Sequence, residues 1–284
     1  MMPSTIRMGD KGATVRQCQE YLTAHGFPTA TDSHFGPATQ SKVMQFQQSR
    51  SLAVDGIVGN KTWTELEADV QLSAPPEPPG PLPPVLQHMK SLGYPIIWKG
   101  DYHLILFGIR SKNPKANSFD DTLGCAYTEK GLWTVHFWPA TCDPGSYHLK
   151  NPSSVAGTAI MAPGFYENAY SIDLHAGKYE AICQRRGPVV AFRDSDKTEM
   201  LTMEPRSKAE GYFGLNIHRS SIHTDTVAEA EKALVERWSA GCQVHARIDA
   251  FETMMTLARR QRDVLGISSF SYCLMEDWTD ENNG

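Results

Sequence analysis

The sequence has no long apolar run, no excess of basic residues and no paired cysteine motif, and each absence excludes a class of protein. No stretch of its 284 residues approaches the roughly 18 apolar residues of a membrane-spanning helix, so no membrane insertion is expected. Lys and Arg total 27 against 32 Asp and Glu, which argues against a nucleic-acid-binding protein. The six cysteines form no C-x-x-C pair, so the sequence indicates neither a zinc ribbon nor a thioredoxin-like motif.

The N-terminus likewise lacks the apolar core of a secretory signal. Its opening segment, MMPSTIRMGDKGATVRQ, contains no apolar run. We therefore expect the protein to stay in the cytoplasm where it is made until another protein releases it. A reducing compartment favours free, buried thiols at most of the cysteines.

A proline-rich segment divides the chain. Residues 71–85 contain seven prolines in fifteen positions, and proline lacks the N–H that a helix interior or a central strand requires. Such a segment is typical of an extended, semi-rigid spacer. The sequence therefore predicts an N-terminal domain over residues 1–70, a linker over 71–85 and a larger domain over 86–284.

The N-terminal domain is predicted to be all-α, with three short helices. Apolar residues at helical spacing predict a helix over Asp10–His25, and Pro37 is suited to the first turn of a second helix. The third is predicted over Lys61–Val70. The turns at residues 32–39 and 55–62 both contain Asp, an apolar residue, Gly and Thr at matching offsets, which indicates a short internal duplication.

With these turns in order, residues 5–70 resemble the three-helix peptidoglycan-binding domain of cell-wall hydrolases. The resemblance implies that bacterial peptidoglycan is the partner and that this domain is a tether rather than a catalyst, while most of its motif residues serve the fold. The residues it marks for the binding module are Asp32, Phe35, Gly36, Asp55, Gly56 and Trp63.

The C-terminal domain is predicted to be a β-rich α+β domain. Short runs bounded by Gly, Pro or polar residues predict strands at Gly131–Trp138, Tyr170–His175, Val189–Arg193, Gly214–His218 and Phe270–Met275. Apolar stripes predict helices over Asp225–Arg237 and Arg247–Leu265. Residues 86–155 match no motif and are open to interpretation as an insertion, a lid or part of a substrate groove.

One His and one Cys in this domain form a candidate catalytic pair. His218 ends a predicted strand, and Cys242 follows a Ser-x-Gly turn 24 residues later. A cysteine nucleophile needs an imidazole to take its proton and later to protonate the leaving group. Small residues before the Cys let backbone N–H groups approach a developing oxyanion.

This arrangement is similar to the His…Ser-x-Gly-Cys signature of the L,D-transpeptidase (YkuD-like) family, over roughly residues 155–275. The resemblance implies a cysteine acyl-enzyme acting on peptidoglycan stem peptides, with Cys242 as nucleophile and His218 as general base and acid. It also implies that Ser239 orients the imidazole and that Gly241, with the Cys242 backbone, lies at the oxyanion site. The sequence departs from the family pattern at Arg219 and Val244 and in the longer gap between His and Cys.

Polar and aromatic neighbours of the pair are expected to contact the substrate, and neither a cofactor nor a metal is expected. These neighbours are Tyr212, Asn216, Arg219, Trp238 and Gln243.

The order of binding domain and catalytic domain resembles a modular bacteriophage endolysin. This analogy implies a monomeric peptidoglycan hydrolase that leaves the host cytoplasm to degrade the wall. An L,D-transpeptidase that remodels the wall and a non-catalytic wall-binding virion protein stay open. So does a glycosidase, for which Glu167, Asp173, Glu180 and Glu210 qualify by residue type alone. A zinc peptidase also stays open, although His175, His218, His223 and His245 show no familiar ligand spacing.

Overall fold

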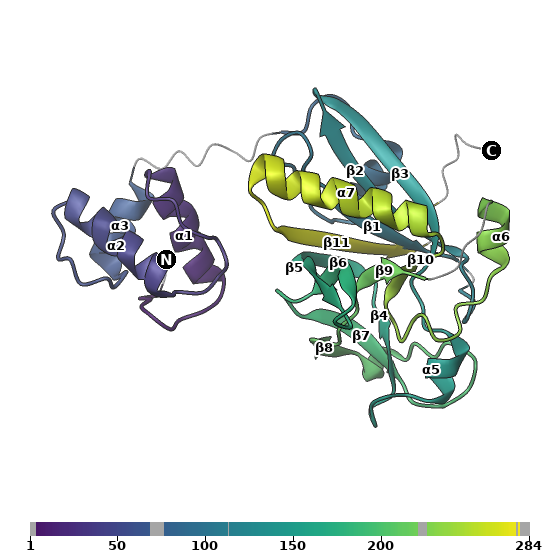
Figure 1. The fold of residues 1–284 in the computed structure, drawn as a ribbon. Coiled ribbons are helices and arrows are strands. Elements are labelled where there is room, and N and C mark those ends of the chain that lie inside the picture. The colour runs from purple at the N-terminus through teal and green to yellow at the C-terminus, as the bar shows by residue number, and fades with distance from the viewer. Residues whose placement is uncertain (1–3, 69–76, 113, 221–225, 277, 279–284) are drawn as a thin grey trace. The chain divides into compact units, whose positions relative to one another are not determined.

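The computed structural model divides the chain into two compact units, Met1–Pro75 and Pro76–Gly284 (Figure 1). It describes residues 4–68, 77–112, 114–220, 226–276 and 278. Each unit has its own apolar core, with Trp63 and Phe46 at the centre of the first and Tyr170 and Tyr272 in the second.

The first unit is helical, with α1 (Ala13–Ala24), α2 (Pro37–Ser49) and α3 (Asn60–Glu67). The second helix begins at Pro37 as predicted, because proline lacks only an N–H that the first turn leaves unpaired. The first helix begins later than predicted, because Gly12 directly before it has a φ of 113°, which is outside the helical range. The predicted end of the third helix, at Val70, lies outside the described residues.

The two related turns of the first unit are built on the same hydrogen bonds. Gln19 Nε2 donates to Asp32 Oδ1 (2.8 Å), and its Oε1 accepts from Ser33 N (3.0 Å). In the second turn, Gln47 Nε2 donates to Asp55 Oδ1 (2.8 Å), and its Oε1 accepts from the N–H of the residue after Asp55 (2.9 Å). The internal duplication therefore extends beyond the turns to a buried glutamine on the preceding helix.

The second unit is a closed barrel with strand order β1-β11-β5-β6-β9-β10-β3-β2, next to a smaller sheet with order β4-β7-β8. The barrel strands are β1 (Ile105–Arg110), β2 (Asp121–Glu129), β3 (Leu132–Thr141), β5 (Gly164–His175), β6 (Tyr179–Gln184), β9 (Ile217–Arg219), β10 (Gln243–His245) and β11 (Ser269–Glu276). The smaller sheet contains β4 (Thr158–Met161), β7 (Val189–Asp194) and β8 (Ala209–Gly211).

Helices accompany the strands of the second unit. They are α4 (Pro84–Ser91), α5 (Ser146–Lys150), α6 (Val227–Lys232), α7 (Ile248–Leu265) and the 3-10 turn η1 (Pro205–Ser207). The apolar stripe of α7, including Phe251 and Met254, belongs to the main apolar cluster of the unit. Figure 1 shows this helix lying across strands of the barrel. None of the described helices combines the length and apolar character needed to cross a bilayer.

Residues 86–155, which no motif explained, supply most of α4, the strands β1, β2 and β3, and α5. Strands β2 and β3 pair antiparallel from Asp121 with Ala140 to Glu129 with Leu132, and β1 is buried along its whole length. This stretch is therefore part of the barrel wall and is neither an insertion nor a lid.

The second half of the proline-rich segment packs onto the second unit, in contrast to the predicted linker over 71–85. Trp133 Nε1 donates to Pro79 O (3.0 Å), and Pro84 begins α4. Val85 and Leu86 are buried in the apolar cluster under this helix. A proline at the first helical position lacks only an N–H that would be unpaired in any case, so proline content here did not exclude a helix.

The predicted strand runs overlap β3, β5, β7, β9 and β11, although β9 begins only at Ile217 and shares just two residues with the run predicted over Gly214–His218. The helix predicted over Arg247–Leu265 is confirmed as α7. The helix predicted over Asp225–Arg237 is wrong in extent, because α6 ends at Lys232 and Asp225 lies outside the described residues. Val235 N donates instead to Asn117 O (3.2 Å), so pairing with a distant segment replaces the helical bond. All six cysteines are free and buried, as expected.

Candidate active site

The parallel pairing of β9 with β10 brings the predicted Cys and His to one face of the barrel wall. His218 pairs with Val244, and Gln243 N donates to Asn216 O (2.9 Å) just before the paired region. Paired residues face the same side of a sheet, and alternate residues share a face. Cys242, directly before β10, therefore lies diagonally beside His218.

The turn before Cys242 is held by a serine and requires a glycine. Ser239 Oγ accepts from Gly241 N (3.1 Å) and donates to Cys242 O (2.8 Å). Gly241 has a φ of 110°, and a Cβ there would lie 2.0 Å from Ala159 O on β4. The predicted role of Ser239 in orienting the imidazole is therefore wrong, since its hydroxyl holds the cysteine turn instead.

The imidazole of His218 is buried, with 2% of its surface exposed, and a backbone carbonyl sets its tautomer. Its Nδ1 lies 2.9 Å from Arg219 O. A carbonyl oxygen can only accept, so Nδ1 carries the proton and Nε2 holds the basic lone pair. Tyr179 OH donates to the same carbonyl (3.3 Å), which fixes the carbonyl from the other side.

A second histidine stacks on His218. The ring centroids of His175 and His218 are 4.1 Å apart. Asn216 Nδ2 lies 3.0 Å from His175 Nδ1, and Asn216 Oδ1 accepts from Gln184 N (2.9 Å). Asn216 is 6% exposed with both ends of its amide bonded, so it positions the histidine stack and is not presented to substrate as predicted.

Burial keeps both members of the pair neutral. It lowers the pKa of His218 to about 3, with the neighbouring His175 acting in the same direction. It raises the pKa of Cys242 to about 11, although the backbone N–H of Asn216 acts in the opposite direction. The thiol donates to Gly214 O (3.5 Å). The resting site is thus a thiol beside a neutral imidazole and not a thiolate–imidazolium pair.

The other predicted substrate contacts divide into one buried and three accessible residues. Gln243 is wholly buried, and its Oε1 accepts from Tyr272 OH (2.9 Å), so the predicted substrate contact is wrong at this position. The Arg219 guanidinium lies over the Tyr179 ring, 4.6 Å from its centroid. Tyr212 and Trp238 are 63% and 40% exposed.

Sequence reasoning gave no site role to Tyr179, Ala159 or Arg193. Tyr179 lies on β6 and Ala159 on β4, far from the motif in sequence, and neither belongs to a recognisable local pattern. Their roles follow from strand pairing, which no residue spacing near Cys242 reveals.

A pocket of about 390 Å³ lies beside the cysteine turn, between that turn and the smaller sheet. Ala240, two residues before Cys242, forms part of its wall, and Ala159 and Arg193 form another part. Its other lining residues include Gly157, Thr158 and Phe213. We call it the Arg193 pocket.

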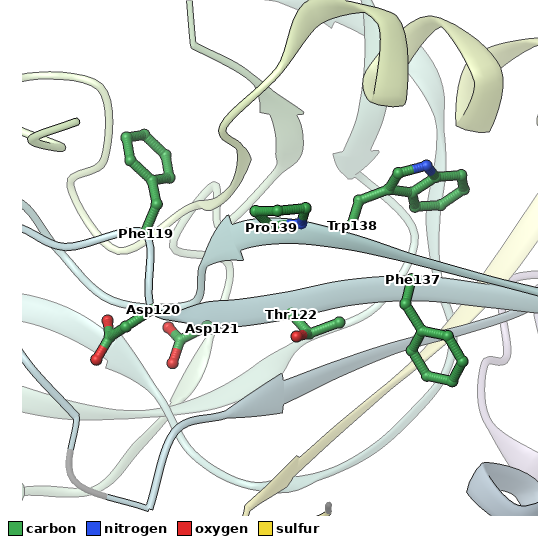
Figure 2. A pocket seen from close by; sticks show the side chains of 7 residues that line it. All are labelled: Phe119, Asp120, Asp121, Thr122, Phe137, Trp138 and Pro139. Atoms are coloured by element: carbon green, nitrogen blue, oxygen red, sulfur yellow. The ribbon is translucent and has the colours of Figure 1, made fainter. Parts of the chain in front are cut away.

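A second pocket, of about 510 Å³, lies where β2 begins and β3 ends (Figure 2). Figure 2 shows the carboxylates of Asp120 and Asp121 on one side of the hairpin and the rings of Phe119 and Trp138 on the other. Phe119 also packs in the same apolar cluster as Cys242. Burial raises the pKa of Asp121 to about 8, with Asp143 nearby acting in the same direction. The pocket lining consists of Phe119, Asp120, Asp121, Thr122, Phe137, Trp138 and Pro139.

The carboxylates considered for a glycosidase do not form a facing pair at this site. Asp173 is paired with Arg185 (2.7 Å), and Glu180 with Arg259 (3.0 Å), with all four side chains at the surface. Of the histidines considered for zinc, His223 lies outside the described residues. In the part of the chain that the structure describes, no three His, Cys, Asp or Glu side chains are grouped so that they could hold a metal.

The six marked residues of the first unit serve its fold. Phe35 and Trp63 are completely buried, and Trp63 Nε1 donates to Ser4 O (3.1 Å). The carboxylates of Asp32 and Asp55 accept from the turn glutamines, Gly36 precedes α2, and Gly56 has a φ of 69°. A shallow pocket of about 390 Å³ beside the second turn includes the more accessible Asn60 and Lys61.

Comparisons with known proteins match the first unit. Residues 11–66 match the family described as putative peptidoglycan binding domain. The zinc D-Ala-D-Ala carboxypeptidase of Streptomyces albus G is 38% identical over 65 residues, which cover 22% of this chain and 26% of that protein. The chain thus spans about a quarter of that curated relative, and it spans 54% of another, an uncharacterized protein of Kitasatospora aureofaciens, at 38% identity.

Among solved structures, the Burkholderia AP3 phage endolysin is 45% identical over 23% of this chain and 25% of that chain, with a TM-score of 0.23. The L,D-transpeptidase of Xylanimonas cellulosilytica aligns over 96% of this chain and 98% of its own, at 14% identity and a TM-score of 0.22. The family match confirms the resemblance of the first unit. With TM-scores this low, neither structure bears on the second unit.

Proposed function

We propose that the protein binds bacterial peptidoglycan through its first unit and cleaves stem peptides in its second through a cysteine acyl-enzyme. The family match over residues 11–66 supports the first half of this proposal. The second half rests on one observation. His218 pairs with Val244 across β9 and β10, which supports a position for Cys242 on the same face of the wall, and Ala240 of the cysteine turn lines a pocket.

The tautomer of His218 suits it to act as a general base. As Sγ of Cys242 attacks the stem-peptide carbonyl carbon, the thiol proton passes to Nε2 of His218. Arg219 O, which accepts from Nδ1, stabilises the imidazolium that forms. The N–H of Gly241 is bonded to Ser239, so the Cys242 N–H is the donor proposed for the oxyanion.

Collapse of the tetrahedral intermediate breaks the peptide C–N bond, and the imidazolium protonates the departing amine. This leaves a thioester on Cys242 and a neutral His218. Water, deprotonated by His218, then attacks the thioester carbonyl. The C–S bond breaks, the acyl group leaves as a carboxylic acid, and the imidazolium returns its proton to Sγ of Cys242. The endolysin-like order of domains favours water as the acceptor.

Transfer to an amine is the second candidate. The pocket of Figure 2 borders the cluster that contains Cys242, and Asp120 Oδ1 is buried in the described structure without a hydrogen-bond partner. A buried carboxylate oxygen without a partner attracts an ammonium group, and aromatic rings in the same pocket favour a cation further. Such an acceptor would give a new cross-link instead of a free acid.

Digestion of purified sacculi tests these possibilities together. The wild-type protein and Cys242→Ala are incubated with sacculi, and the soluble and insoluble products are identified by mass spectrometry. Cys273→Ala, which removes a buried thiol from a different apolar cluster than that of Cys242, is the matched control. We expect new peptide carboxyl ends with the wild type and the control and none with Cys242→Ala, while wall binding persists in all three.

Other products would identify other functions. New cross-links would favour transfer to an amine, and new reducing sugar ends would indicate a glycosidase. Digestion that continues unchanged in Cys242→Ala would contradict the proposed mechanism.

A further inference from the structure

The Arg193 pocket contains a cation whose hydrogen-bonding capacity is only partly used. Arg193 Nη2 donates to Gly157 O, and the guanidinium lies 5.1 Å from the centroid of the Phe213 ring. Its Nε is buried and has no hydrogen-bond partner within the described residues. A guanidinium has five N–H donors in a planar fork, so an unpaired buried Nε is costly unless a ligand takes it.

No carboxylate of the described chain is paired with this arginine. The nearest in sequence, Asp194, follows it on β7 and accepts from Asp196 N (3.3 Å) and Thr202 N (2.9 Å). Successive residues of a strand face opposite sides, so Asp194 is directed away from the arginine. Burial lowers the pKa of Arg193, but arginine stays protonated in proteins. The pocket therefore presents an uncompensated positive charge.

Direct contacts connect this charge to the cysteine turn. Arg193 on β7 pairs with Ala159 on β4. Ala159 O in turn lies so close to Gly241 that a Cβ there would be 2.0 Å away. Ala240 of the same turn lines the pocket. A ligand held by Arg193 would thus lie against the turn that carries the nucleophile.

We propose that Arg193 binds a free carboxylate of the stem peptide and so sets which carbonyl reaches Cys242. The volume of about 390 Å³ suits one or two amino-acid residues. The planar fork of arginine suits a carboxylate bound through two oxygens. This inference rests on the proposed function, because it takes the stem peptide as the ligand. Arg193 is a substrate-binding residue and takes no part in proton transfer.

Binding to the full-length Cys242→Ala protein tests the inference without any turnover. Calorimetry compares a synthetic stem tetrapeptide that has all its carboxylates with peptides in which one carboxylate at a time is a carboxamide. We expect one of these amides to bind about 10- to 100-fold more weakly, the loss typical of a charged hydrogen bond. The amide that loses affinity identifies which carboxylate, C-terminal or side-chain, the arginine holds.

Variants then assign the effect to Arg193. Arg193→Gln in the same background should weaken binding of the full peptide by the same factor and no longer distinguish it from the critical amide. Arg193→Lys keeps the charge and should retain part of the affinity. Arg206→Gln, which removes an exposed arginine of η1, is the matched control and should bind as the parent does.

Equal binding of all peptides by the parent protein would overturn the inference even if Arg193→Gln failed to fold. Unchanged binding by a folded Arg193→Gln, or no binding of any peptide, would overturn it as well. Failure of the proposed function is a separate result. If sacculi are not digested but a carboxylate binds through Arg193, the proposed chemistry fails and this inference stands.

Discussion

The two units use their motif residues in different ways. In the first, the polar motif side chains satisfy one another, as Gln19 with Asp32 and Gln47 with Asp55 show. In the second, the motif residue His218 donates through Nδ1 to Arg219 O, which leaves Nε2 as the basic nitrogen, and Arg193, outside the motif, has a buried Nε without a partner in the described structure. The difference teaches that these motif side chains of the first unit hold its fold, whereas the second unit has buried polar groups whose hydrogen-bonding capacity the described chain leaves unused.

The largest effect on activity is expected at Gly241, where the second unit has no space for a side chain. Gly241→Ala would place a Cβ 2.0 Å from Ala159 O on a backbone with a φ of 110°. The turn must then shift, and a misplaced nucleophile costs on the order of 100-fold or more in turnover. Digestion rates and the unfolding of the second unit measure this. Unaltered digestion by Gly241→Ala would mean that the turn geometry does not matter for activity.

The stability of the second unit should fall in acid. Burial lowers the pKa of both His218 and His245 to about 3, whereas an unfolded histidine titrates near pH 6.5. Above that pH both states are neutral and the histidines contribute nothing. Below it, the unfolded chain takes up protons that the folded unit refuses until about pH 3, so the free energy of unfolding decreases by up to about 1.4 kcal/mol per pH unit for each histidine.

Denaturant unfolding of the second unit between about pH 7 and pH 5 checks this slope. His245→Phe is the informative variant, since His245 packs edge-on between Trp138 and Phe251 and a phenyl ring can occupy that space. His245→Phe should reduce the pH dependence of the free energy of unfolding by the equivalent of about one bound proton. A slope that stays the same would show that His245 is not the group that titrates.

A medium effect is expected in the first unit, where one glutamine holds each turn. Gln47→Ala removes the buried amide that bonds Asp55, Ile57 and Gly56, and it leaves the buried Gly56 N–H without this acceptor. Losses of about 2–3 kcal/mol in the free energy of unfolding are expected. Gln19→Ala should cost a similar amount, because the two turns are built alike. Unfolding of the first unit measures both, and a large inequality between them would break the symmetry of the duplication.

The smallest effect on stability is expected at the positive-φ residue that each of the two related turns contains. Ser33 has a φ of 62° where its counterpart Gly56 has 69°. Ser33→Gly should therefore stabilise the first unit by up to about 1 kcal/mol, since glycine adopts this backbone without strain. Gly56→Ser should destabilise it by more, because a Cβ there would be 2.8 Å from Gln40 Cγ. Thermal unfolding of the two variants should shift in opposite directions.

Local signals in the sequence were sufficient to place those helix ends that a proline or a glycine marks. Pro37 marks the start of α2, and Gly266, with a φ of 68°, ends α7 at Leu265. The helix predicted over Asp225–Arg237 failed because Asn117, far away in sequence, takes the backbone bonds that would have continued it. The strands β1 and β2 were missed because their buried runs carry no alternating pattern and no motif.

By itself, the sequence determined the helical first unit, its peptidoglycan-binding-like motif and the choice of the candidate pair, Cys242 and His218. These depend on turn residues, capping positions and spacing, which act over a few residues. Only the tertiary structure decided that Ser239 holds the turn, that Gln243 is core, and that Arg193 from β7 lines a pocket with Ala240 of the cysteine turn. Those outcomes depend on which strands pair and which face is buried, and pairing between distant segments leaves no local trace in the chain.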